Sequence, residues 1–122
     1  MQLTKETGMD IVSLDSRLND VVKQGKMLEA LAEFYDEGCT FQEGNDTPRV
    51  GRKTQHDHLA GFFATLKGFN GATLHSQCIG DDTTLTEWTF DMDGPDGPIV
   101  WNEILRRKWK NGKVVSERFY TA

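Results

Sequence analysis

The pair Asn111-Gly112, set between two runs of alternating residues, constrains the fold more than any other feature of this sequence. An Asn-Gly pair flanked by apolar runs is the strongest short-range signal for a β-hairpin. One face of the first run carries Ile99, Trp101, Glu103, Leu105, Arg107 and Trp109, and one face of the second carries Val115, Glu117, Phe119 and Thr121. Because large apolar residues on one face of a strand require a core, we expect Trp101, Leu105 and Trp109 to be buried.

Two acidic residues, Glu103 and Glu117, share these apolar faces. Burying a carboxylate is costly unless it is paired or protonated. Two interpretations follow from the pattern alone. The two carboxylates either line a cavity, or they form an inward ion pair with Arg107, which has the same parity.

Three helices and three β segments are predicted before the hairpin. Apolar residues at spacings of three and four indicate helices over residues 9–23, 26–35 and 54–67. Residues 39–43 form a short β-prone stretch, and residues 72–79 are strand-like. Alternation indicates a strand over 84–92, with Thr86, Trp88, Phe90 and Met92 on one face. Helices followed by strands indicate an α+β fold, with three N-terminal helices packed on one face of a curved antiparallel sheet.

Length and charge restrict the function classes. The 122 residues suit a single domain, 1–122, in which we expect residues 1–8 to be frayed. A net charge of −5 disfavours nucleic acids and anionic membranes as partners, since both require a basic surface. No apolar run has the length of a membrane helix, and residues 1–8 lack a signal-peptide core, so we expect a cytoplasmic location.

Four stretches carry a resemblance to a known family: LEALAEFYDEGCTFQEG, VGRKTQHDHLAGFFATL, GDDTTLTEWTFDMDG and ILRRKWKNGKVVSERFY. In this order they resemble the SnoaL-like and ketosteroid isomerase-like proteins of the nuclear transport factor 2-like superfamily, which has a cystatin-like fold. The resemblance covers residues 9–122 and implies a cone, in which a curved sheet wraps a long helix and the open end holds an apolar pocket. Members include isomerases, dehydratases, cyclases and non-catalytic binders, so the fold does not decide the function.

The resemblance also suggests site residues. Glu43 stands where the isomerase-like relatives have a carboxylate base, although it is one methylene longer than their usual Asp. We expect Glu43 to face a cavity bounded by Phe63, Trp88 and Phe119, with its pKa raised by desolvation. The alternative is a solvated residue at a strand end. The hairpin register places Leu105, rather than a second acid, where those relatives carry one.

Further candidate ligand contacts are mostly aromatic, and each could instead belong to the core: Tyr35, Phe41, Phe63, Trp88, Phe90, Trp101 and Phe119, together with the acidic Glu103 and Glu117. We expect no cofactor and no metal, since His56 and His58 lack the spacing of four typical of a zinc helix. The resemblance therefore implies a protein with a pocket for a small apolar molecule, either a cofactor-independent isomerase, lyase or cyclase, or a non-catalytic binding or interaction domain. An outward apolar set predicts a homodimer through the sheet: Val100, Ile104, Val114 and Tyr120.

Overall fold

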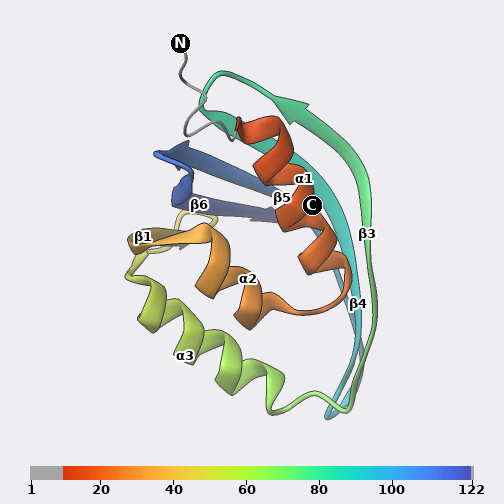
Figure 1. Ribbon diagram of the computed structural model, residues 1–122. Helices are drawn as coiled ribbons and strands as arrows, with labels where there is room; N and C mark the ends of the chain where they lie inside the picture. Colours follow the sequence, from red (N-terminus) through yellow and green to blue (C-terminus); the bar gives the residue numbers. More distant parts are fainter. Residues whose placement is uncertain (1–9, 122) are drawn as a thin grey trace.

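The computed structural model describes residues 10–121, so the expectation for residues 1–8 lies outside the described part. Its three helices and six strands follow one another as α1 (Ile11–Lys23), α2 (Met27–Phe34), β1 (Tyr35–Glu43), β2 (Arg49–Val50), α3 (Arg52–Phe63), β3 (Gly68–Ile79), β4 (Thr83–Gly94), β5 (Gly97–Lys110) and β6 (Lys113–Thr121). Figure 1 shows the long strands β3 and β4 curving around one side of the helices. The predicted α+β class is therefore confirmed.

The strands form one sheet in the order β2-β1-β6-β5-β4-β3. All neighbours are antiparallel except β1 and β6, which run parallel. The sheet is thus mixed and mostly antiparallel, where the sequence predicted an antiparallel one. The difference arises because β1, which precedes α3, pairs with the last strand of the chain. No local pattern reports a pairing between segments so distant in sequence.

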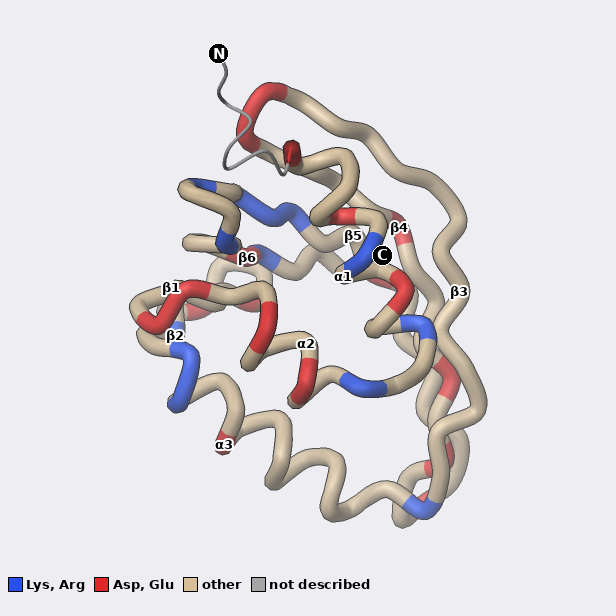
Figure 2. The backbone as a smooth tube through the Cα atoms, viewed as in Figure 1, with Lys and Arg blue, Asp and Glu red and all other residues tan. Residues whose placement is uncertain are grey.

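Several element bounds differ from the prediction. The second helix ends at Phe34, and β1 begins directly at Tyr35, four residues before the predicted strand. The third helix covers Arg52–Phe63 and stops before the predicted residues 64–67. Its second half, after Asp57, carries no acidic or basic residue other than His58, and Figure 2 shows this uncharged stretch of the tube. Most of the α3 side chains that line the pocket described below come from this half.

The core lies between α1, α2 and the concave face of the sheet. Leu14, Leu18 and Val22 of α1 are buried there, as the helical periodicity predicted. Within the hairpin Leu105 and Trp109 are buried as predicted, but Trp101 is 37% exposed. The prediction that Trp101 is buried is therefore wrong. Its indole stacks on Phe62 of α3, with ring centroids 5.0 Å apart, at the edge of the pocket and outside the core cluster.

The hairpin forms at the predicted turn, with φ values of 52° at Asn111 and 79° at Gly112. Two positive φ values are the requirement of a tight two-residue hairpin turn. A β-bulge follows, because Trp109 pairs with Val114 whereas Lys108 pairs with Ser116. The extra residue turns Val114 inward, where it is fully buried. Its predicted place in an outward apolar patch is therefore wrong.

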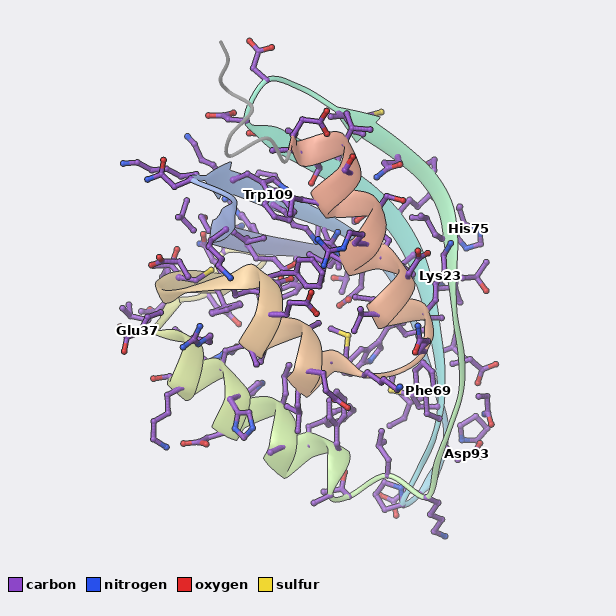
Figure 3. The ribbon with its side chains drawn as sticks, in the orientation of Figure 1. Lys23, Glu37, Phe69, His75, Asp93 and Trp109 are labelled. Atoms are coloured by element: carbon purple, nitrogen blue, oxygen red, sulfur yellow. The ribbon has the colours of Figure 1, made fainter. Side chains whose placement is uncertain are left out.

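The junction of α1 and α2 depends on Gly25, which has a φ of 76°. An added Cβ there would come within 2.8 Å of the ring of Phe69, the first aromatic residue of β3. Figure 3 shows Phe69 reaching from β3 toward this junction. Gly25 thus lets β3 close against the helical layer beside the pocket. In residues 10–121, no helix has the length and apolarity that crossing a membrane requires.

Candidate functional site

A cavity of about 680 Å³ lies between α2, α3 and the inner face of the sheet. This volume is in the usual range for a small-molecule site. Apolar side chains form most of its wall, including Met27 and Leu31 of α2 and Leu59, Phe62 and Phe63 of α3. The strands supply the charged groups Glu43, Glu103 and Glu117. An apolar pocket with a few polar groups is thus the natural candidate site.

Glu103 is one of the three acidic groups that line this pocket. It lies on β5 opposite Trp88 of β4 and Thr121 of β6, and its side chain is half-buried in the pocket wall. No described residue hydrogen-bonds to its carboxyl group. Burial, followed by the charges of Glu117 and Glu43, raises the pKa of Glu103 to about 7. A carboxyl group with this pKa is present in both protonation states near neutral pH, so it can accept or donate a proton.

Glu117 also lines the pocket, but the protein occupies its carboxylate. The hydroxyl of Tyr35 donates to Glu117 Oε2 over 2.7 Å, and Arg107 Nε donates to the same oxygen over 3.2 Å. Burial raises the pKa of Glu117, and Arg107 opposes this effect. Of the two interpretations open from the sequence, the ion pair with Arg107 holds for Glu117, whereas Glu103 lies in the cavity.

Arg107 belongs to a buried polar cluster that links the pocket to α1. Its Nη1 donates to Asp15 over 2.9 Å and to Asn19 over 2.6 Å. The hydroxyl of Thr84 on β4 also donates to the carboxylate of Asp15, over 2.8 Å. Sequence reasoning missed this cluster, although Asp15 and Asn19 are spaced four apart beside the apolar stripe of α1. That polar pair was the available signal, because residues at this spacing share a helix face.

Glu43 lies at the rim of the pocket and is half exposed. Its carboxylate pairs with Arg49 of β2 over 2.6 Å and lies 3.7 Å from His58 of α3. Arg49 also donates to the buried Gln55 over 2.7 Å, which fixes the guanidinium in place. The predicted catalytic role of Glu43 stays a prediction. Its carboxylate has polar partners, and Phe119, one of the aromatic residues that the sequence suggested, lies opposite Glu43 in the register of β1 and β6.

The predicted aromatic contacts fall into two groups. Five of them line the pocket: Tyr35, Phe63, Phe90, Trp101 and Phe119. Phe41 and Trp88 are not among the residues that line this cavity. Both are fully buried, Phe41 stacked on Tyr35 with centroids 5.6 Å apart and Trp88 stacked on Phe90 with centroids 5.4 Å apart. They belong to the core because each lies beneath the aromatic ring that forms the pocket surface.

The structure adds pocket residues that the sequence did not single out. From α3 these are Gln55, His58, Leu59 and Phe62, and from the following segment Leu66, Lys67 and Phe69. The apolar stripe on α3 predicted a buried helix face but could not distinguish a cavity from a core. Among residues 10–121, no group of three or more His, Cys, Asp or Glu side chains is arranged to hold a metal ion.

Comparison with known proteins supports this architecture. The model of the SnoaL-like domain matches residues 16–117. A Mesorhizobium loti protein, provisionally named a SnoaL-like polyketide cyclase, superposes with a TM-score of 0.82 at 18% identity, covering 92% of this chain and 99% of that one. A Jannaschia protein with the same provisional name gives 0.76 at 14% identity, covering 90% and 83%.

A third structure, from Catenulispora acidiphila, was solved in complex with trimethylamine and has a ketosteroid isomerase-like fold. It superposes with a TM-score of 0.68 at 14% identity, covering 82% of this chain and 78% of that one. Among curated proteins, none is detectably similar in sequence. At these identities the structural likeness establishes the fold, and the activity has to be argued from the site.

Proposed function

This chain belongs to the SnoaL-like domain family, and we propose that its pocket binds a small, largely apolar molecule and moves a proton on it without a cofactor. One observation carries the proposal: the carboxyl group of Glu103 opens into an apolar cavity, has no hydrogen-bond donor among the described residues and has a pKa of about 7. A general base works best when its pKa lies near the working pH. The provisional names of two structural relatives, polyketide cyclases, are consistent with such chemistry.

The proposed role of Glu103 is to remove a proton from a carbon next to a carbonyl group and to return it, or an equivalent proton, later in the reaction. Isomerisation, elimination and cyclisation of carbonyl compounds all begin with this step. The aromatic walls exclude water from the ionised carboxylate and so keep it basic. Glu43 at the rim is the weaker candidate because Arg49 already occupies its carboxylate.

A second function, non-catalytic binding, is favoured by one specific feature. The hydroxyl of Tyr35 is already donated to Glu117. In this arrangement it is not free to stabilise negative charge on a substrate oxygen, a contribution that is usually large in enolate chemistry. The trimethylamine complex of the Catenulispora protein is consistent with a fold that holds small molecules. A protein with a base but no oxyanion donor would bind its ligand and turn it over poorly.

Deuterium exchange separates the two functions. A panel of cyclic and linear ketones is incubated with the protein in heavy water, and NMR follows loss of the α-proton signals. The proposal predicts catalysed exchange whose kcat/KM increases as pH rises through about 7, its loss in Glu103→Gln, and its retention in Glu43→Gln. Native mass spectrometry on the same panel measures binding. Binding without exchange would support the non-catalytic function, and exchange that survives Glu103→Gln would reject the assigned base.

We also propose a homodimer through the outer face of the sheet. Val100, Ile104 and Tyr120 are 54%, 43% and 39% exposed there, and Leu85 of β4 adds a fourth apolar side chain at 41%. A shared apolar face of this kind is commonly covered by a twofold contact. Sedimentation at micromolar concentration should give twice the chain mass, and Ile104→Asp should shift it to that of one chain. A wild-type monomer would remove this proposal and leave the pocket chemistry intact.

A further inference from the structure

The charged groups of the pocket are unbalanced. Glu103 and Glu117 lie within the wall, and Glu43 lies at the rim. Among the described lining residues Lys67 is the one with a fixed positive charge, and it is exposed after the end of α3. Arg107 compensates Glu117 from behind, and Arg49 compensates Glu43. The carboxyl group of Glu103 is left without a cationic partner among these residues.

Aromatic residues lie at neighbouring positions of the pocket wall. On the inner face of β5, Trp101 precedes Glu103 by two residues, and Phe119 of β6 lies opposite the next inward position, Leu105. Phe62 of α3 stacks on Trp101 with centroids 5.0 Å apart and brings a second ring over the same region. The faces of aromatic rings attract cations, most strongly when water is excluded. A carboxylate among rings is the composition of sites that hold alkylammonium groups.

We propose that the ligand of this pocket is an apolar organic cation, a tertiary or quaternary ammonium compound, whose charged group lies beside Glu103 between Trp101 and Phe119. This inference rests on the proposed function, because it specifies the ligand of the same cavity. A neutral ligand would strip water from the ionised form of Glu103 without replacing the lost interactions. A cation replaces them with an ion pair in a water-poor site, and its alkyl groups pack on the aromatic wall.

Binding of a cation should be coupled to the protonation of Glu103. The other titratable groups that face this region are Glu117 of β6 and Glu43 and Tyr35 of β1, with His58 and Lys67 on the α3 side and Arg107 behind Glu117. Of these, burial and Glu117 raise the pKa of Tyr35, so it stays neutral over the working range. A bound cation stabilises the ionised form of Glu103, and its affinity should therefore increase as pH rises through about 7.

Three probes of nearly one shape test the inference: choline, its neutral isostere 3,3-dimethylbutan-1-ol and the anionic 3,3-dimethylbutanoate. Affinity is measured by NMR titration of the Trp101 indole N–H, assigned with Trp101→Phe. At pH 8.5 choline should bind at least tenfold more tightly than the alcohol, and the anion should bind most weakly. This preference should fall at least threefold at pH 5.5. It should also fall at least threefold in Glu103→Gln at pH 8.5, whereas the outward Glu37→Gln control should retain it.

The possible outcomes distinguish failure of the cation inference from failure of the proposed function. Tighter binding of the alcohol than of choline, or a choline preference unchanged by pH and by Glu103→Gln, overturns the cation inference while leaving a small-molecule pocket in place. Failure of all three probes, together with no ligand from the ketone panel, overturns the proposed function as well. Thermal unfolding of Glu103→Gln at pH 8.5 checks that the variant is folded, so that lost binding can be assigned to the carboxylate.

Discussion

Replacing Glu103 by Gln should stabilise the protein, and the structure gives the size of the effect. The pKa of Glu103 rises from an ordinary 4.5 to about 7 in the fold. Because its folded pKa is the higher one, the stability linked to this group is fully present below pH 4.5 and is lost as pH rises through about 7. A pKa difference of one unit corresponds to about 1.36 kcal/mol, so complete ionisation of Glu103 would lower the free energy of unfolding by about 3 kcal/mol. Since the pocket admits some water to the carboxyl group, we expect about 2 kcal/mol.

Urea unfolding followed by tryptophan fluorescence measures this effect. Glu103→Gln should match the wild type at pH 4 and exceed its free energy of unfolding by about 2 kcal/mol at pH 8.5, because Gln keeps the shape and removes the buried charge. Glu37, which points outward in Figure 3, supplies the matched control, and Glu37→Gln should stay within about 0.5 kcal/mol at both pH values. Equal stability of Glu103→Gln and wild type at pH 8.5 would show that the carboxyl group is well solvated, and the argument for a pocket base would fail with it.

Three further perturbations test the frame around the pocket. Leu105→Ala should lower the free energy of unfolding by about 2–5 kcal/mol in urea, and a cost below about 0.5 kcal/mol would contradict the strand parity. Arg107→Met should cost about 3–5 kcal/mol at pH 7, because it leaves the buried carboxylate of Glu117 without its cation, and the cost should shrink as pH falls and the carboxyl group protonates. Gly25→Ala should lower the melting temperature by several degrees, since the left-handed φ of 76° is strained for Ala and the new methyl group meets Phe69, and an unchanged melting temperature would refute this.

Local patterns predicted the elements of this fold well, and pairings between distant segments poorly. Alternation placed Thr86, Trp88, Phe90 and Met92 on one face of a strand, and all four are buried. The Asn111-Gly112 pair predicted the hairpin, because the turn requires positive φ at both positions. The parallel pairing of β1 with β6 depends on the packing of the whole chain, so no local pattern contains it. The bulge that turns Val114 inward likewise shows itself only in the register of the two strands.

The site was predictable in its chemistry more than in its geometry. The oddity of Glu103 and Glu117 on apolar faces is visible in the sequence, and both line the pocket. Their different roles are not visible, because they depend on which carboxylate Arg107 reaches. The same limit explains Trp88: an inward aromatic ring is either core or cavity wall, and only the packing of Phe90 over it decides.

The contrast between Glu103 and Glu117 suggests how one small domain can tolerate an unpaired acid beside its core. Glu117 accepts hydrogen bonds from Tyr35 and Arg107, and Arg107 in turn donates to Asp15 and Asn19 of α1, so this satisfied acid ties the helix to the sheet. Glu103 lies on the neighbouring strand, with no such support, where the fold opens into a cavity. A buried charge without partners destabilises a protein, and such groups are concentrated at functional sites, where the energetic cost is linked to reactivity. Glu103, whose ionised form lowers stability, is therefore the acid on which binding or proton transfer should depend. Glu117, whose carboxylate has its partners, positions the wall of the pocket around Glu103.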